Sequence, residues 1–304
     1  MTAAITPTFD GGRPAGADGL RRPRQPTRSR VLVVARTDLR QLYQSPDFWV
    51  PMVILAGFFF VIAPAGLLWA ITHVSRSDLV QKVGATLSVL PGSARSAINA
   101  RAPHASAAVK ASYALAVYLF APLAVIVPMT ISTAVGANCL VGERERGTGE
   151  FLSHAPVTER DLYLGKLIAS LVPGYLTTLV GFGIYSLVVN LIVGPHVGGW
   201  FFPTRQWWLL MLWVVPPFLA ITLSVVLRLS ARVKSAAAAQ QASGLVTLPA
   251  IVAAYAQSSG ALFTHGVGNI WVGGAAWVVA AIGLRRGARA VTRARLLGVD
   301  GDLG

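Results

Sequence analysis

The sequence predicts an all-α polytopic membrane protein, and three observations lead to this fold class. Of its 304 residues 54% are hydrophobic and only 12% are charged, whereas a soluble domain carries about 25% charged residues. Apolar runs recur along the chain, and none of them contains Asp, Glu, Lys or Arg. The net charge of +14 flanks these runs, as in membrane proteins, instead of gathering on one folded face as nucleic-acid binding requires. We therefore expect no nucleic-acid partner.

The chain is expected to begin with two segments outside the bilayer. Residues 1–28 are rich in Pro, Gly and Arg without an apolar run, which predicts a disordered basic arm. In residues 29–45 one helical face carries Leu32, Ala35, Leu39, Leu42 and Tyr43, and Arg40 lies on the opposite side. This pattern predicts an interfacial amphipathic helix with its arginines near lipid phosphates. A soluble amphipathic helix would show the same pattern and remains the alternative.

Six segments are candidates for crossing the bilayer, which takes about 20 apolar residues in a helix. They are residues 48–71, 113–140, 167–193, 207–227, 244–256 and 268–284. The fifth is short, and apolar character resumes at 261–263, so it bends back or ends in a re-entrant piece. Ser45, Pro46 and Asp47 predict a break before the first span, because they supply an N-cap, a proline at N1 and an acid in the first turn.

The distribution of basic residues predicts the orientation of these spans. With both termini cytoplasmic, twenty Lys and Arg lie on the inner side and six on the outer side. The protein is therefore expected to be multi-pass in the cytoplasmic membrane, with an outer loop at 73–112 that holds short helices and a basic cytoplasmic tail at 285–304. Prolines inside the spans, such as Pro122, Pro128 and the Pro216–Pro217 pair, are expected to bend them. An outer aromatic belt is expected to hold Trp200, Trp207, Trp208 and Trp271.

The cytoplasmic segment at 141–166 carries the most information about function. It holds five acids and four bases, which is nearly half of the acids in the chain. Gly147, Gly149 and Pro156 interrupt any helix, while Phe151 and Leu152 place apolar side chains in water. Thr158 and Asp161 have capping-box spacing, so a new helix is expected to start there and run into the third span. The physical reading is a docking element with an apolar knob, and the alternative is a solvated charged loop.

The residues of this segment carry a resemblance to a known family. The run from Glu143 to Leu152, followed by Ala155-Pro156-Val157-Thr158 and by Gly165-Lys166, resembles the signature of ABC-2 type permeases, the membrane subunits of ATP-binding-cassette exporters. A second patch from Ser230 to Pro249 resembles the family's segment between spans four and five. The resemblance covers about residues 30–285. It departs from the family pattern at Gly149 and at Ser153-His154.

The resemblance implies partners and a coupling site. Two ABC ATPase subunits would bind ATP and Mg, and a second permease copy or a related permease would complete the transporter together with membrane lipid; this chain would bind no cofactor itself. The coupling residues carried over are Glu143, Arg144, Glu145, Arg146, Gly147, Glu150, Phe151, Leu152 and Pro156. A second cytoplasmic contact is expected at Arg232 and Lys234.

Other classes of protein lack their signatures in this sequence. A P-loop needs Gly-x-x-x-x-Gly-Lys-Ser/Thr, and the one lysine that follows a glycine, Lys166, precedes Leu167. A membrane enzyme or an ion-driven carrier would need ionisable groups inside the bilayer, and no predicted span holds an acid. Neither a catalytic nor a metal site is therefore expected. The polar residues that are candidates for a substrate path are Asn138, Thr177, Thr178 and Asn190, although hydrogen bonds between helices are their commoner use.

These observations predict the permease subunit of an ATP-driven exporter. It would move a small amphipathic molecule, a drug or a lipid out of the cell, with energy from the separate ATPase. The alternative is a scaffold or anchor subunit of a larger complex that transports nothing.

Overall fold

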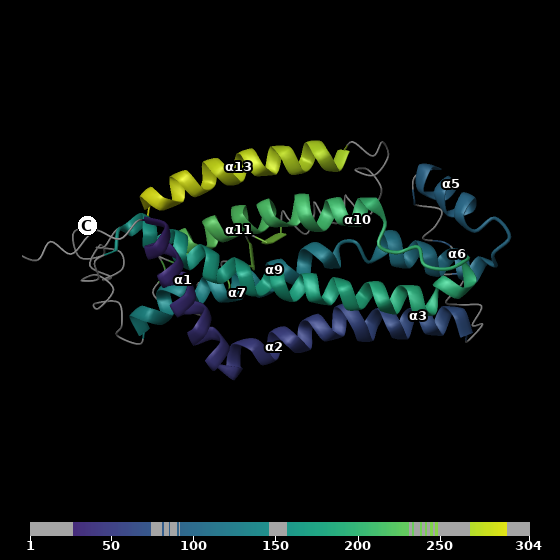
Figure 1. Cartoon of the computed structure of the whole chain (residues 1–304), viewed down its shortest axis with the longest axis horizontal. Helices are drawn as coiled ribbons and strands as arrows, with labels where there is room; N and C mark the ends of the chain where they lie inside the picture. Colours follow the sequence, from purple (N-terminus) through teal and green to yellow (C-terminus); the bar gives the residue numbers. More distant parts are fainter. Residues whose placement is uncertain are drawn as a thin grey trace, which may run out of the picture.

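The computed structural model describes residues 27–73, 92–145, 157–230 and 268–290, together with positions 81, 85, 90, 233, 238, 241, 244–245 and 247–248. All regular structure in this part of the chain is helical (Figure 1), which confirms the predicted all-α class. Most of the predicted arm at 1–28 and the last residues of the predicted tail lie outside the described residues.

Four stretches of helix are long and apolar enough to cross a membrane. They match the first four predicted spans and run over Pro46–His73, Ala107–Ala137, Glu159–Ile192 and Arg205–Ser230. The first consists of α2 (Pro46–Gly57), the π-helical segment η1 (Phe58–Ile62) and α3 (Ala63–His73). The second consists of α6 (Ala107–Ala114), η2 (Leu115–Leu119) and α7 (Leu123–Glu145), and the third is α9 (Glu159–Ile192). The fourth consists of α10 (Arg205–Leu209), η4 (Leu210–Val214) and α11 (Val215–Ser230).

The last two predicted spans have different outcomes. The fifth, at 244–256, lies mostly outside the described residues, so it stays a prediction. The sixth falls within α13 (Gly268–Ala290), which continues six residues beyond the predicted end at 284. The first residues of the predicted tail at 285–304 are therefore helical, a correction that follows from the helix-forming Arg and Ala residues there.

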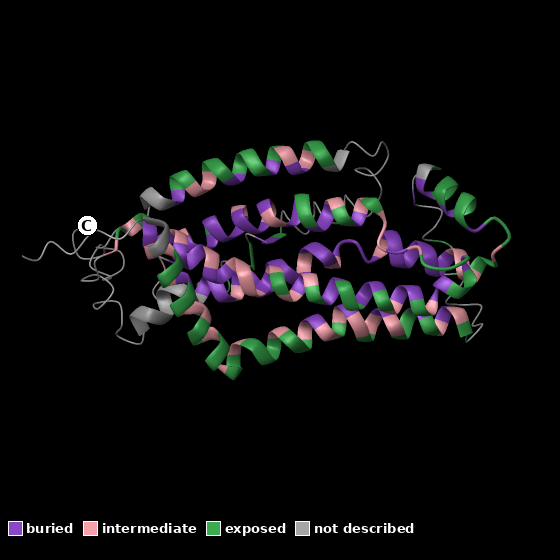
Figure 2. Cartoon of the chain, in the orientation of Figure 1, coloured by how far each residue is buried: buried purple, intermediate pink, exposed green. Residues whose placement is uncertain are grey.

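The second span lies at the centre of the bundle. In its apolar window 72% of the residues are buried, against 28% in the first span, and Figure 2 shows the same contrast between α6 or α7 and the exposed flanks of α2 and α13. The short helices α5 (Gly92–Arg101) and η3 (Gly194–His196) lie at the end of the bundle opposite to the start of α9 (Figure 1). The predicted outer loop thus contains a helix, as expected, but α6 begins at Ala107, six residues before the predicted start of span two.

Helix α1 (Thr27–Gln44) forms where the interfacial helix is predicted. Of the residues on its predicted apolar face, Ala35 is buried and Leu39 and Leu42 are partly buried, whereas Leu32 and Tyr43 are 62% and 83% exposed. Val34, next to this face, contacts α9. The ionic partners that Arg30 and Asp38 find on α9 hold this side of the helix against the bundle.

Each of three π-helical segments is followed closely by a proline. Pro64 follows η1, Pro122 follows η2 and Pro216 follows η4 within two or three residues. A proline offers no amide to the helix and crowds the preceding turn, and a widened turn is one way to accommodate it. The amide of Val215, for example, donates to the carbonyl of Leu210 five residues earlier. The predicted disturbance at Pro122 and Pro216 thus takes the form of π segments.

Candidate functional site

The predicted coupling segment is anchored by two helix ends. Helix α7 continues to Glu145, so Glu143, Arg144 and Glu145 lie in its last turns rather than beyond the span end predicted at 140. Arg146, Gly147, Glu150, Phe151, Leu152 and Pro156 lie outside the described residues, as do Arg232 and Lys234 of the predicted second contact. The connection between α7 and α9 therefore spans residues 146–158.

The start of α9 has the predicted cap. Thr158 is the N-cap residue, and its hydroxyl oxygen accepts a hydrogen bond from the backbone amide of Asp161 over 3.2 Å. Glu159 and Asp161 lie in the first turn, where carboxylates interact favourably with the positive end of the helix dipole. The cap confirms that a new helix begins at this point, directly after the predicted docking segment.

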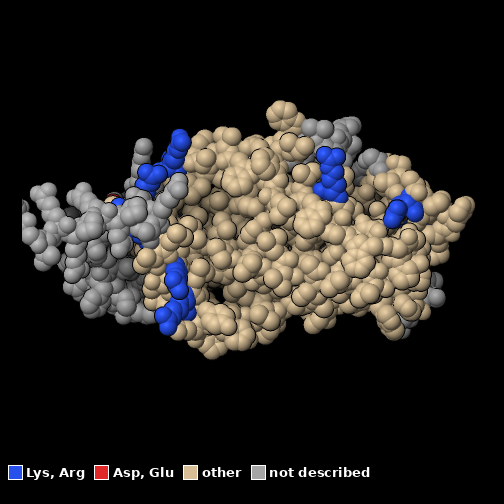
Figure 3. Space-filling model, viewed as in Figure 1, with Lys and Arg blue, Asp and Glu red and all other residues tan. Residues whose placement is uncertain are grey.

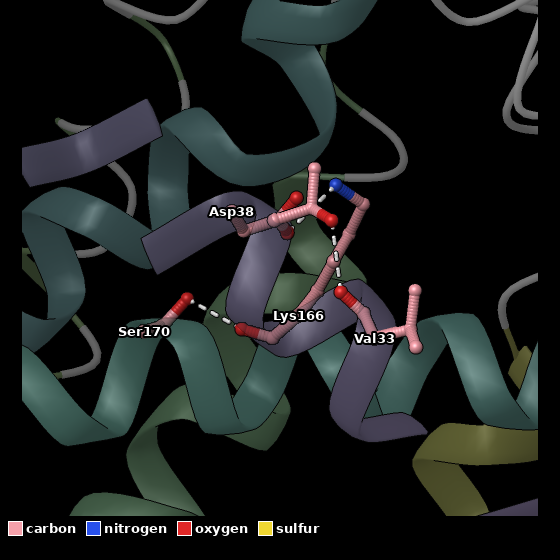
Figure 4. A network of polar contacts seen from close by, with 5 residues as sticks. Val33, Asp38, Lys166 and Ser170 are labelled. Atoms are coloured by element: carbon pink, nitrogen blue, oxygen red, sulfur yellow. Dashed lines mark hydrogen bonds and ion pairs between the residues drawn. The ribbon is translucent and has the colours of Figure 1, made fainter. Parts of the chain in front are cut away.

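Two ion pairs hold this end of α9 against α1. Arg30 Nε lies 3.4 Å from Asp161 Oδ2, and Lys166 Nζ lies 3.3 Å from Asp38 Oδ2. The side chains on α9 are almost fully buried, with 1% exposure for Asp161 and 2% for Lys166. Figure 4 shows Lys166 reaching from α9 to Asp38 on α1, while its own carbonyl accepts a hydrogen bond from the Ser170 hydroxyl. We call this pair of contacts the α1–α9 clamp.

A glycine brings the two helices of the clamp close together. A Cβ at Gly165 would lie 2.6 Å from Cγ1 of Val34 and 3.2 Å from the carbonyl oxygen of Val31. Any larger residue at 165 would push α1 away and lengthen both ion pairs. Close packing and opposite charges therefore fix α1 to the first two turns of α9.

We expect substitutions of Lys166 and Asp38 to have strongly non-additive effects on the free energy of unfolding. Lys166→Met leaves the Asp38 carboxylate without its ionic partner and is expected to lower the free energy of unfolding by about 3 kcal/mol, because breaking a buried pair costs more than removing both charges. The double variant Lys166→Met/Asp38→Leu should recover most of that loss. A double-mutant cycle by chemical denaturation in mixed micelles measures the coupling.

Arg285→Met is the matched control for this cycle, because Arg285 is an exposed cation on α13. It should change stability by less than about 0.5 kcal/mol. Equal losses for the single and the double clamp variants would show that the ion pair is not what holds α1.

Further polar contacts tie the same end of the bundle together. Arg228 near the end of α11 donates to the carbonyl of Gly283 on α13, and the Ser230 hydroxyl donates to the carbonyl of Ala137 on α7 over 2.7 Å. Tyr163 of α9 lies against Gly287 of α13. The ends of α11 and α13, the start of α9 and α7 at Ala137 thus form one packed platform at the end of the bundle where α9 begins.

The predicted substrate-path residues have separate environments. Asn190 is buried, and its amide donates to the carbonyls of Ser186 and Phe202, while its oxygen accepts from the amides of Phe201 and Phe202. The Thr178 hydroxyl donates to the carbonyl of Gly174 within α9. Both side chains thus have a structural use, which was the alternative to a transport path.

Thr177 and Asn138 complete the predicted set. Thr177 lines an apolar cavity between α1, α2, α7 and α9. Asn138 lies on α7, but its side chain is outside the described part of the structure. Of the three whose side chains the structure describes, only Thr177 lines this cavity, so Thr177, Thr178 and Asn190 are not brought together into one lining.

An aromatic cluster fills the bundle where the second span is interrupted at Phe120–Pro122. Helical bonding fails there, and the Tyr185 hydroxyl and the Trp207 indole donate instead to the carbonyls of Ala116 and Val117, over 2.7 Å and 2.8 Å. Trp207 is only 2% exposed, so its assignment to an outer aromatic belt is wrong. The hydrogen bond to a carbonyl freed by the break draws its indole inward.

Sequence reasoning missed the clamp and the aromatic cluster. Asp38 is the only acid among the basic residues between 19 and 46, and such an isolated acid was a usable signal for a buried partner. The cluster offered a weaker signal, since aromatic residues in apolar spans also face lipid. Within the described residues no group of three or more His, Cys, Asp or Glu could hold a metal ion.

Comparison with known proteins identifies the family. Residues 32–266, about three quarters of the chain, match the family described as ABC-2 family transporter protein. No curated protein matches the chain. The match covers most of α1, the Lys166–Asp38 pair of the clamp, the connection at 146–158 and the four helices of span length. The chain therefore belongs to the ABC-2 transporter family, as a membrane-embedded permease subunit of an ABC transporter whose ATPase activity lies in a separate subunit.

Proposed function

We propose that the chain is a permease subunit of an ATP-driven exporter in the cytoplasmic membrane. In this proposal two ABC ATPase subunits bind ATP and Mg and dock on the connection at 146–158, and two permease chains enclose the path of an amphipathic molecule, a drug or a lipid. The observation that supports it best is the family match together with the platform from which this connection emerges.

The clamp explains how force at the connection would reach the membrane. A push on residues 146–158 acts on the first turn of α9, which the cap at Thr158 and the pair with Arg30 hold in place. Because α9 is one continuous helix of 34 residues, displacement of its start tilts the whole span. Helix α1 would move with it, since the ion pairs and Gly165 join the two helices.

The packing of the last helix supports an even number of spans with both termini cytoplasmic. Trp213 of η4 donates to the carbonyl of Ile270, and Arg228 of α11 to that of Gly283, so the fourth span and α13 run parallel. Parallel neighbours in the chain need an intervening crossing, and the fifth predicted span at 244–256 would supply it. The basic ends of α11 and α13 would then lie on the inner side.

The test of the proposal is reconstitution with the ATPase that co-purifies with the chain. Vesicles that contain both proteins should accumulate a fluorescent amphipathic cation or a labelled lipid when ATP and Mg are added, and vesicles with either protein alone should not. A stable complex that shows no ATP-dependent movement of any probe would favour the scaffold or anchor subunit instead. Accumulation of a probe in vesicles that contain this chain alone would contradict the proposal that a separate ATPase supplies the energy.

A further inference from the structure

An apolar cavity lies inside the bend between α1 and α2, which we call the elbow. Helix α1 ends at Gln44 and α2 begins at Pro46, and the change of direction leaves a gap of about 250 Å³ in front of α7 and α9. Its lining comes from all four helices and includes Leu39, Tyr43, Trp49, Val135, Pro173 and Thr177. In Figure 3 the surface is hollowed at this place, beside basic side chains that lie over α1.

Two arginines stand next to this cavity. Arg36 and Arg40 are exposed on α1, and each lies three or four residues from Leu39 or Tyr43, the spacing of neighbours on a helix surface. Leu39 and Tyr43 line the cavity, so the arginines lie beside its mouth, and Arg40 is closer to the apolar residues than the predicted opposite side of the helix. Of the acids near this elbow in the described residues, Asp38 is paired with Lys166 and only Asp47 remains. The mouth therefore carries net positive charge.

We propose that this elbow cavity binds one acyl chain of an anionic phospholipid of the inner leaflet, with the phosphate held between Arg36 and Arg40. An acyl chain gains little by leaving one apolar environment for another, so selectivity has to come from the headgroup. Guanidinium groups at the membrane surface attract anionic lipid and bind phosphate oxygens through paired N–H donors. Tyr43 and Trp49 suit the interfacial level, because their rings combine apolar faces with a polar atom.

This site rests on the proposed inner-interface position of α1, but it involves neither nucleotide nor the ATPase. The lipid would fill the space that allows the α1–α2 elbow to flex, and it would join α1 to the membrane surface. Its binding can be measured on the isolated chain, so failure of the lipid site and failure of the transport function give different results.

The experiment is native mass spectrometry of the full chain, released from detergent that contains equal amounts of phosphatidylglycerol and phosphatidylcholine with identical acyl chains. The natural sequence should retain phosphatidylglycerol preferentially, with about a fivefold preference for each arginine, which is the effect of one basic residue near an anionic surface. Arg36→Gln/Arg40→Gln should remove the preference. Arg285→Gln/Arg286→Gln, which removes two exposed arginines from α13, should keep it.

A second variant tests the cavity itself. Thr177→Phe places an aromatic ring into the lining and should reduce retention of phosphatidylglycerol severalfold, whereas Val180→Phe, one turn further along α9 and exposed, should not. Equal retention of the two lipids by the natural sequence would overturn the proposal, and so would an unchanged preference in Arg36→Gln/Arg40→Gln. Retention that Thr177→Phe leaves intact would place the lipid outside the cavity and overturn it as well.

Discussion

Gly174→Ala is expected to disrupt the packing of α7 against α9. A Cβ at this position would contact the Ser132 hydroxyl and lie 2.8 Å from the carbonyl oxygen of Pro128 and 3.1 Å from the amide nitrogen of Ser132. The hydroxyl can rotate away, but the two backbone atoms cannot move without the helix. Overpacking of this kind costs about 3 kcal/mol, and the central position of α7 in the bundle leaves little room for relaxation. The measurement is the loss of folded protein on heating in detergent.

Gly183→Ala is the matched control on the same helix. A Cβ at Gly183 would meet nothing within 4 Å, so this variant should be neutral or gain up to about 1 kcal/mol from helix propensity. Ser132→Ala in the Gly174→Ala background should not rescue stability, because the carbonyl of Pro128 remains in place. Full rescue, or equal stability of the two alanine variants, would show that the helices are not in backbone contact here.

The elements that sequence reasoning predicted well are those in which hydrophobicity decides the structure. Runs of span length without charge appear as helices of span length, and the turn chemistry of Ser45–Pro46 and Thr158 predicts two helix starts. These signals are local, since they depend on residues within one turn of the boundary. The early start of α6 at Ala107 has a local signal of the same kind, because Ser106 is its N-cap and accepts a hydrogen bond from the amide of Val109, but sequence reasoning missed it.

The contacts of α1 show what local reasoning leaves out. A stripe of apolar residues predicts one face of a helix, and Ala35, Leu39 and Leu42 of the predicted stripe are buried or partly buried. The stripe does not predict that Asp38 and Arg30 meet Lys166 and Asp161 on α9, because these partners are more than one hundred residues away in sequence. A single sequence does not show which acid will meet which base.

The residues of the candidate site also differ in how well the sequence indicates their role. Asn190 and Thr178 were identified from polarity alone, but polarity does not distinguish a lining from a structural hydrogen bond. The side-chain amide of Asn190 forms hydrogen bonds with the backbone of Phe201 and Phe202. The sequence contains no spacing that indicates this contact. The docking segment was predicted from a different signal, the coincidence of charged residues, glycines and apolar residues in one short stretch outside the spans, and its role stays a prediction.

The double variant Phe151→Ala/Leu152→Ala is expected to abolish substrate-stimulated ATP hydrolysis by the reconstituted complex. Glu145 and Glu159 bound the segment that carries these residues, and both lie at the packed end of the bundle, where the cap and the clamp hold α9. If this charged segment lies in water, as its sequence predicts, its two apolar side chains have a favourable partner only in a groove of another protein. Loss of such central anchors typically costs a protein interface 2 kcal/mol or more each, that is, about a thousandfold in affinity for the pair.

Ser153→Ala/His154→Ala is the matched control, because it truncates two neighbouring residues of the same connection without removing an apolar anchor. It should keep at least half of the stimulation. Membrane insertion and thermal stability should be unchanged in both double variants, since their positions precede the cap at Thr158 and do not belong to the clamp. If substrate still stimulates ATP hydrolysis in Phe151→Ala/Leu152→Ala, these two side chains do not couple the permease to the ATPase. Glu145→Gln then tests whether charge at the end of α7 makes the contact with the ATPase. A contact that depends on charge weakens as the salt concentration rises, whereas an apolar contact does not.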